Sequence, residues 1–372
     1  MSVPFLDLKA SYTTLQPEID SAVARVLGSG VYIGGAEVEA FENEFAAFVG
    51  AAHCVAVANG LEGLQLALLA VGVQPGDEVI VPAHTFVATW LAVTQCGAIP
   101  VPVDICPDTY QLDAAQLETA ITPRCRAIVP VHLYGVPVDL DPILATAAAY
   151  GLAVVEDAAQ AHGTTYRGRR IGAHGAAATW SFYPGKNLGA YGDAGAVTTD
   201  DAVLASRLRR LRNYGSSVRY VHEERGFNSR LDPMQAAILR VKLAHLEAWN
   251  ARRREIAARY MRDLAGTSVV LPTVPAWAES SWHLFPVRYG RRDALREALA
   301  VAGIETLIHY PIPPHLQRAY TDLGHSRGSF PVAEATADTV LSLPIGPAMT
   351  GIQVDAVIEA VGYAIRMVER VA

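Results

Sequence analysis

Three short segments of the sequence combine residue types that could do chemistry together. The first, GLAVVEDAAQAHG, places Asp157 directly after an apolar run that predicts a strand, with Gln160 and His162 within one turn of it. The carboxyl ends of parallel strands border the crevice in which α/β proteins bind ligands. A single acid there can equally be a turn carboxylate or a helix N-cap. The amide and the imidazole beside it favour a site.

The second segment, SFYPGKNLGAYGDAGAVTT, presents Lys186 on a Pro-Gly turn that follows a predicted strand ending near Ser181. A lone lysine is most often a solvated surface charge. Here a glycine-rich stretch follows, which keeps the backbone compact and helps to bury the amine. Because burial lowers the pKa of a lysine, it makes the free amine available for Schiff-base chemistry.

The third segment, ANGLEGLQLALLAVG, passes from a strand into a helix through Asn59 and Gly60. A glycine at a helix N-terminus exposes backbone N–H groups and the positive end of the helix dipole, which can bind phosphate. The spacing matches neither GxGxxG nor GxxxxGK, and a glycine in such a turn can serve geometry alone. Together the three segments supply a phosphate site, a strand-end carboxylate and a reactive lysine, the minimal set for pyridoxal phosphate.

The elements that must position these residues follow an alternating pattern of short β-type runs and helical runs between about residues 50 and 200. This alternation predicts an α/β core built from parallel βα units. The strands are near-continuously apolar, as expected for strands covered on both faces. They are predicted at 54–58, 78–82, 99–103, 127–132, 152–156, 178–182 and 195–198. Helical periodicity covers 61–70 and 232–260, the latter as one long helix or two abutting ones.

Beyond residue 264 the pattern changes to a strand-like segment at 282–290, a helix at 292–302 and a terminal helix after Ile352. A chain of 372 residues is long enough for one large and one smaller domain. We therefore expect residues 1–250 to form an N-terminal arm and the large domain, with the start of the linking helix. Residues 251–372 are expected to form the small C-terminal domain.

The composition excludes several classes of protein. A net charge of -7 with 51% hydrophobic residues argues against a disordered or nucleic-acid-coating chain. The N-terminus has Asp7 where a signal peptide needs apolar residues, so no cleaved signal peptide is expected. The longest apolar region is interrupted by polar residues and prolines, so no membrane span is expected. The four cysteines show no CxxC or zinc spacing, which favours free thiols in the cytoplasm and no metal site.

The joint presence of VVEDAAQAHG, SFYPGKNLG and GFNSRLDPMQAA resembles the DegT/DnrJ/EryC1/StrS family of sugar aminotransferases, over nearly the whole length from PFLDLKASY to LSLPIGP. The resemblance implies fold type I, like aspartate aminotransferase: a large, mostly parallel sheet domain flanked by helices plus a smaller α+β domain. It also implies a ping-pong reaction. L-glutamate converts pyridoxal phosphate to pyridoxamine phosphate, which then aminates a nucleotide-linked keto-sugar. FYPGKNLGAYGD looks most like members that aminate C3 of dTDP-3-keto-6-deoxyhexoses in deoxyaminosugar biosynthesis.

The resemblance also implies roles for individual residues around the cofactor ring. Lys186 would form the Schiff base and later move the proton between cofactor and substrate carbons. Asp157 would pair with the protonated pyridine nitrogen, which preserves the ring as an electron sink. Gln160 would hydrogen-bond the 3-oxygen. Phe86, in HTFVATW, would stack on the ring, although a phenylalanine after a strand is ordinarily part of the core.

At the phosphate, the resemblance assigns the backbone of Gly60 and Leu61 together with the Ser181 hydroxyl. The family commonly has Ser or Thr where Asn59 stands. In GFNSRLD, Asn228 and Arg230 match a segment that reaches the neighbouring subunit's phosphate in this family, which implies a homodimer with shared active sites. The same segment also suits an ordinary N-cap region for the helix that follows. Residues in segments that face the sugar nucleotide in relatives, or that support such contacts, are Tyr183, Arg219, Tyr220, His309, Tyr310 and His315.

Four alternatives differ in what they require. A family dehydratase keeps a histidine where Lys186 stands. A C4-aminating or UDP-sugar aminotransferase would use the same central residues. A non-catalytic sugar-nucleotide sensor could use the same fold, because a fold alone does not fix a function. A dinucleotide-binding oxidoreductase would need the glycine fingerprint that this chain lacks.

Overall fold

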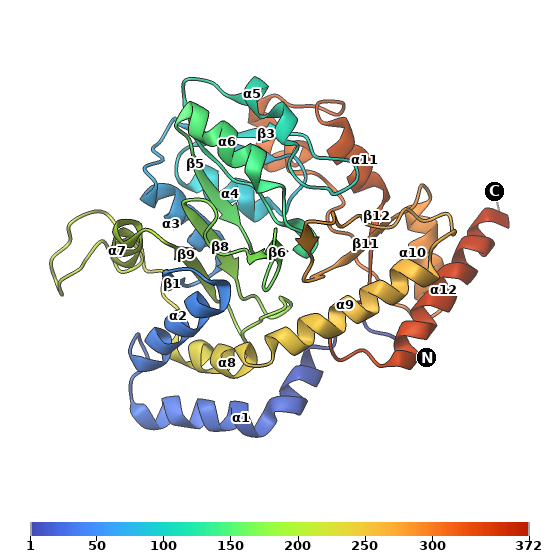
Figure 1. Ribbon diagram of the computed structural model, residues 1–372, viewed down its shortest axis with the longest axis horizontal. Coiled ribbons are helices and arrows are strands. Elements are labelled where there is room, and N and C mark those ends of the chain that lie inside the picture. The colour runs from blue at the N-terminus through green and yellow to red at the C-terminus, as the bar shows by residue number, and fades with distance from the viewer. Residues whose placement is uncertain (1, 371–372) are drawn as a thin grey trace.

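The computed structural model describes residues 2–370 and contains a seven-stranded mixed sheet with helices on both faces (Figure 1). The strand order is β1-β9-β8-β5-β4-β2-β3. The strands are β1 (His53–Val57), β2 (Glu78–Pro82), β3 (Ile99–Val103), β4 (Cys125–Ile128), β5 (Ala153–Asp157), β8 (Ala177–Ser181) and β9 (Gly195–Thr199). Each predicted strand of the core is present within a few residues, and the predicted fold class is confirmed.

The sheet is mostly parallel, as predicted, and β9 is its antiparallel member. β9 pairs antiparallel with both β1 and β8, whereas the pairs β5–β8, β4–β5, β2–β4 and β2–β3 are parallel. Parallel neighbours need a crossover connection, usually a helix. β8 and β9 are joined only by the loop 182–194, so the chain turns back at the same edge of the sheet. That loop carries Lys186.

The sheet is apolar on both faces because alternate residues of each strand enter different cores. Val55 and Val79 pack in one core, while Ala56 and Ile80 pack in the other. The first core is covered by α3 (Gly60–Ala70), α4 (Val87–Gln95) and α7 (Ala202–Leu211). The second is covered by α2 (Ala36–Val49), α5 (Leu117–Ala120), α6 (Leu140–Tyr150) and α8 (Pro233–Leu243). This burial explains the continuous apolar runs in the sequence.

The predicted helix at 232–260 is two helices, α8 and α9 (Leu246–Asp263), which are separated at Ala244–His245. α1 (Leu8–Ser29) packs along α8 through Leu15, Ile19 and Ile238. In Figure 1, α8 lies between the sheet and α1, and α9 rises from it toward the C-terminal elements α10 and α12. The two helices therefore contact both parts of the chain.

The C-terminal residues form a separate apolar cluster. β11 (Phe285–Arg288) pairs antiparallel with β12 (Val340–Leu343), and α9, α10 (Arg292–Val301) and α12 (Gly351–Arg370) pack around them. The domain boundary at residue 250 stays a prediction, which this separate cluster supports. The remaining elements are β6 (Thr165–Tyr166), β7 (Arg169–Arg170), β10 (Ala278–Glu279), α11 (Pro331–Thr339), η1 (Ala114–Gln116), η2 (Leu133–Gly135), η3 (Pro314–Leu316) and η4 (Arg318–Leu323). Among the helices of residues 2–370, none has the length and apolar character that crossing a membrane requires.

Candidate active site

Asp157 is the last residue of β5, and its carboxylate is almost entirely buried. One carboxylate oxygen accepts a hydrogen bond from the Thr89 hydroxyl at 2.8 Å, and the other accepts from the Ala159 backbone N–H at 3.2 Å. Thr89 belongs to α4, and its hydroxyl also lies 2.9 Å from that of Thr85. The carboxylate is therefore held in one orientation at the carboxyl end of a parallel strand, as the sequence predicted.

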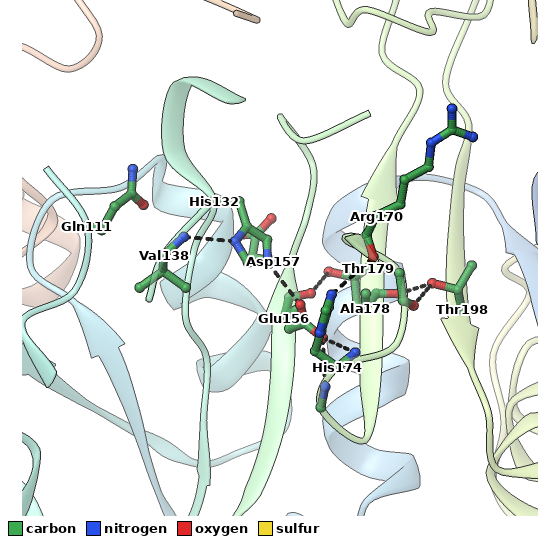
Figure 2. A network of polar contacts seen from close by, with 12 residues as sticks. Gln111, His132, Val138, Glu156, Asp157, Arg170, His174, Ala178, Thr179 and Thr198 are labelled. Carbon is green, nitrogen blue, oxygen red and sulfur yellow. Dashed lines mark hydrogen bonds and ion pairs between the residues drawn. The ribbon is translucent and has the colours of Figure 1, made fainter. Parts of the chain in front are cut away.

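The neighbouring residue Glu156 fixes the end of β5 from the opposite side of the strand (Figure 2). Its carboxylate lies 3.0 Å from His132 Nε2 and accepts from the N–H groups of His174 at 2.9 Å and Gly175 at 2.8 Å. Because His132 Nδ1 accepts from the Val138 N–H, Nε2 is the nitrogen that donates to Glu156. Burial raises the pKa of Glu156, but the His132 hydrogen bond and attraction outweigh it, and the net pKa is lowered.

Lys186 lies in the loop between β8 and β9, where its backbone N–H donates to the Tyr183 carbonyl at 2.8 Å. The residue keeps some exposed surface. Burial of the amine lowers the pKa of Lys186 to about 8, against the opposing attraction of Asp157. A larger share of the amine is then unprotonated at neutral pH than for an ordinary lysine. The amine that the sequence predicts to be reactive therefore has a lowered pKa and is close enough to Asp157 to feel its charge.

Asn187 holds the lysine loop against two other parts of the chain. Its side-chain amide donates to Asn250 Oδ1 on α9 and to the Ser281 carbonyl, both at 2.9 Å, and its oxygen lies 3.1 Å from His283 Nδ1. All these side chains are buried. The position of Lys186 is therefore set by its neighbour in the chain, through α9 and the segment before β11. No local sequence pattern marks Asn187 for this role.

His162 does not join Asp157 in one polar volume. It is fully buried, and its ring packs against the rings of Trp180 and Phe182, with centroids 5.4 and 5.5 Å away. Burial lowers the pKa of His162 to about 3, with a further contribution from the Lys186 charge. The ring is therefore neutral and belongs to the aromatic core beneath β8.

The predicted phosphate site lies where the N-terminus of α3 meets the end of β8. The N–H groups of Gly60 and Leu61 are in the first helical turn, where no intrahelical acceptor exists. Asn59 caps the helix by accepting from the Glu62 N–H at 2.9 Å. The amide of Asn59 thus serves the helix, while the neighbouring Gly60 comes close to Ser181. The closeness of Gly60 to Ser181 brings together the backbone and the hydroxyl that were expected to bind phosphate.

Gly60→Ala is expected to weaken cofactor binding, because an added Cβ would lie 2.7 Å from Ser181 Cβ and 3.1 Å from Ser181 Cα. We expect roughly a tenfold rise in the cofactor dissociation constant and about 1–3 kcal/mol lower stability, the usual cost of overpacking. Gly28→Ala is the matched control, since nothing lies within 4 Å of its added Cβ. Absorbance titration of each apoenzyme with the cofactor measures the dissociation constant of Gly60→Ala and of the control, and thermal unfolding measures their stability. An unchanged dissociation constant in Gly60→Ala would contradict the assignment of Gly60 to the phosphate site.

Gln160 and Phe86 lie beside a loop from the C-terminal part of the chain. The Gln160 oxygen accepts from the Tyr134 N–H at 2.6 Å, and its amide donates to the Tyr310 hydroxyl at 3.1 Å. Phe86 is 52% exposed, and its ring centroid lies 5.3 Å from that of Tyr310. An exposed phenylalanine at the start of α4 is not core packing, which leaves its face free for an aromatic ligand.

Three predicted substrate residues lie near Lys186 in the same chain. Tyr183 is 60% exposed and three positions before the lysine, and Tyr310 contacts Gln160 and Phe86. His309 hydrogen-bonds Ser342 at 2.9 Å through Nδ1. Burial, with the Lys186 charge, lowers the pKa of His309 to about 4, so this ring is neutral. Of the predicted substrate residues, these three share the surroundings of Lys186.

Arg219 and Tyr220 lie on the connection between α7 and α8, which projects from the body of the molecule (Figure 1). Both are exposed, and the Arg219 guanidinium stacks over the Tyr220 ring at 4.8 Å. Asn228 is also exposed, whereas Arg230 donates to Asn213 Oδ1 at 2.9 Å. The residue between them, Ser229, accepts from the Ala58 N–H beside the phosphate site.

His315 differs from the expectation that it faces the substrate. It is 1% exposed, its Nε2 lies 3.0 Å from Glu334 Oε1, and its ring packs on that of Phe330. The Pro313–Pro314 turn directs it into the core under α11 rather than toward Lys186. His315 therefore has almost no surface to offer to a sugar.

The residues at the site fit pyridoxal phosphate. Gly60 and Ser181 approach each other at a helix N-terminus suited to the phosphate, and Asp157 offers an oriented carboxylate to the ring nitrogen. Lys186 offers an amine with a lowered pKa. Thr89 was missed in the sequence, although its i, i+4 spacing from Thr85 at the start of α4 was a visible signal.

The family model described as the DegT/DnrJ/EryC1/StrS aminotransferase family matches residues 13–362. A dTDP-3-amino-3,4,6-trideoxy-alpha-D-glucose transaminase of Streptomyces venezuelae is 56% identical, covering 96% of this chain and 95% of the relative. The erythromycin biosynthesis sensory transduction protein EryC1 of Saccharopolyspora erythraea is 58% identical, covering 96% and 98%. The crystal structure of S. venezuelae DesV with a ketimine intermediate superposes with a TM-score of 0.96, at 56% identity and 98% coverage of both chains. NtdA of Bacillus subtilis, solved with bound PMP, has a TM-score of 0.92 at 33% identity, covering 98% and 85%.

Proposed function

The chain belongs to the DegT/DnrJ/EryC1/StrS aminotransferase family, and on that premise we propose that it moves the amino group of L-glutamate to C3 of a dTDP-linked 3-keto-6-deoxyhexose. It is a pyridoxal-phosphate-dependent aminotransferase. The observation that carries the proposal is the lowered pKa of Lys186, whose amine is close enough to the oriented Asp157 carboxylate to feel its charge. The name of the S. venezuelae relative, which is 56% identical, supports the sugar and the carbon.

Each central residue has a task in this reaction. Pyridoxal phosphate, when bound, supplies an electron sink for the pair that a substrate carbon releases on losing its proton. Lys186 Nζ would anchor the cofactor. It would then take a proton from the donor's carbon and return one to a carbon of the cofactor. The lowered pKa suits both tasks, because only the unprotonated amine can bond or accept a proton. Asp157 holds a proton at the ring nitrogen.

Two molecules of substrate use the site in turn, so the reaction follows a ping-pong order. Tyr183, His309 and Tyr310 would contact the sugar from the same chain as Lys186. We propose further that the enzyme is a homodimer with shared sites. The exposure of much of the segment between α7 and α8 supports the assignment of Asn228 and Arg230 to the partner subunit's phosphate, while Arg219 and Tyr220 in the same segment stay proposed contacts of the sugar nucleotide.

A cytoplasmic location belongs to the same proposal. Cys54, Cys96, Cys106 and Cys125 are all free thiols, and three of them are buried. Free cysteines are typical of proteins in reducing compartments. We therefore expect this enzyme to act where thiols stay reduced, on soluble nucleotide-sugar and amino-acid substrates.

The alternatives differ from this proposal in testable ways. The S. erythraea relative is named for sensory transduction, and a binding protein would need neither a reactive Lys186 nor an oriented Asp157. The lysine also argues against a dehydratase, in which histidine is expected at that position. A C4-aminating or UDP-sugar enzyme would keep both residues. A C4-aminating enzyme differs from our proposal in the carbon that receives the amine, and a UDP-sugar enzyme differs in the nucleotide that its substrate carries.

A panel of dTDP- and UDP-linked 3-keto and 4-keto sugars tests the proposed function. With L-glutamate as donor, we expect the dTDP-3-keto-6-deoxyhexose to be consumed fastest, with NMR placing the new amine on C3. Amination at C4 alone, or a preference for UDP carriers, would overturn the proposed substrate. Absence of any amination across the panel would overturn the proposed sugar chemistry.

A further inference from the structure

A cavity of about 240 Å³ lies beneath the N-terminal arm, beside Lys186. The arm is tied to the C-terminal part of the chain, because Val3 bridges to Ile304 and the Phe5 N–H donates to Glu305 at 3.0 Å. Leu6 then passes over the lysine loop toward α1. The walls come from the loop at Pro184–Asn187, from α8 and α9, and from residues 346–349. The cavity therefore adjoins the proposed active site.

Arg253 on α9 is 3% exposed and lines this cavity. Its Nη1 donates to three backbone carbonyls, those of Trp282 at 3.1 Å, His283 at 3.3 Å and Ile345 at 3.0 Å. Within residues 2–370, Nε and Nη2 make no hydrogen bond, and no carboxylate lies within salt-bridge distance. Burial lowers the pKa of Arg253 only to about 10, so the side chain is charged at neutral pH. Two of its nitrogens are left without a partner.

Lys242 on α8 is a second buried cation in the same wall. Its ammonium donates to the Gly189 carbonyl and lies 4.8 Å from the centre of the Tyr191 ring. It has no ion pair in the part of the chain that the structure describes. Asp7 is the one acid among the described lining residues, and it is exposed and caps α1. Two buried cations without a paired carboxylate are unfavourable unless an anion joins them.

We propose that this cavity binds a carboxylate group of the amino donor, with Arg253 as its main contact and Lys242 adding charge. The inference rests on the proposed function, in which an amino acid supplies the nitrogen. Guanidinium nitrogens match the two oxygens of a carboxylate in a fork. Lys186 lines the cavity, so a donor held there keeps its amino group on the side of the reacting lysine. The cavity is smaller than the roughly 300–1,000 Å³ typical for drug-sized ligands, which favours a small acid over a nucleotide sugar.

The test separates donor binding from sugar binding in the holoenzyme. For Arg253→Gln, we expect the dissociation constant of L-glutamate, from the single donor half-reaction, to rise roughly 10–100-fold, as for a lost charged hydrogen bond. The keto-sugar half-reaction should change by less than threefold. Arg253→Lys should recover part of the affinity. Arg262→Gln is the matched control, because Arg262 is exposed on the same helix.

A second measurement does not depend on turnover. Glutarate, which lacks the amino group, is titrated calorimetrically into wild-type, Arg253→Gln and Lys242→Met holoenzymes. We expect glutarate to bind the wild type and to lose roughly tenfold or more in affinity in either variant. A crystal structure should place a glutarate carboxylate at Arg253 Nη2. Binding that stays the same in Arg253→Gln, or glutarate found elsewhere, would overturn the proposal.

A nucleoside diphosphate is the other source of an oxyanion for this cavity. If thymidine diphosphate displaces glutarate and both half-reactions of Arg253→Gln slow equally, the cavity serves the nucleotide and the donor proposal is wrong. Failure of the sugar panel with intact glutarate binding would leave the cavity assignment standing and overturn only the proposed sugar chemistry. The two failures are therefore distinguishable.

Discussion

Replacing Lys186 by alanine is expected to lower turnover by roughly 10⁴-fold or more, because one amine both anchors the cofactor and moves the proton. The structure supports this size of effect. The amine has a pKa of about 8, and its loop is fixed through Asn187 to Asn250 on α9. Steady-state assays with L-glutamate and the keto-sugar, together with cofactor absorbance, measure the loss. The phosphate site at Gly60 is intact in this variant, so the cofactor should still bind without a covalent bond.

Lys9→Ala is the matched control for this substitution. Lys9 is exposed in the first turn of α1 and should be replaceable without loss of activity. The folded state of both variants is compared by thermal unfolding, which should agree within a few degrees. Activity above a hundredth of wild type in Lys186→Ala, with a normal fold, would contradict the role assigned to the lysine.

Asp157→Ala is expected to lower kcat by about 10²–10³-fold, because the ring nitrogen loses the fixed charge that keeps it protonated. The fold should be retained. In the wild type the Thr89 hydroxyl donates to Asp157, and in the variant it can donate instead to the Thr85 hydroxyl, 2.9 Å away. Stopped-flow measurement of each half-reaction should show both slowed, since the same ring position serves donor and acceptor.

Asp108→Ala is the control for Asp157, because Asp108 is exposed and away from β5. Asp157→Asn adds a second comparison, since it keeps the size of the side chain and removes the charge. If Asp157→Asn retained wild-type half-reaction rates, the pairing with the ring nitrogen would be wrong. A loss confined to Asp157→Ala would then point to packing rather than charge.

The sequence predicted those parts of the fold that local patterns determine. The seven core strands are apolar because both faces are buried, so their positions were visible as continuous runs. No local pattern indicated the direction of β9, because that direction depends on the absence of a helix in the loop 182–194. The break between α8 and α9 was left open, since neither a proline nor a glycine marks Ala244–His245.

At the candidate site, the sequence predicted residues in recognisable segments and missed residues that act through space. Asp157 ends β5, Gly60 begins α3 and Lys186 follows β8 on a Pro-Gly turn, so local patterns could indicate all three. His132, Asn250 and Arg253 come from distant segments and are identified only by their hydrogen bonds. His315 was misplaced because its neighbouring prolines redirect it toward Glu334, a residue 19 positions away.

The most direct test of this account is to locate the lysine that bears the cofactor. The chain has three lysines, Lys9, Lys186 and Lys242. Burial gives Lys242 a pKa of about 8 as well, so a lowered pKa does not by itself distinguish it from Lys186. Borohydride reduction of the holoenzyme, proteolysis and mass spectrometry should find the reduced cofactor on the peptide that contains Lys186. Finding it on Lys242 or Lys9 instead would contradict the central assignment.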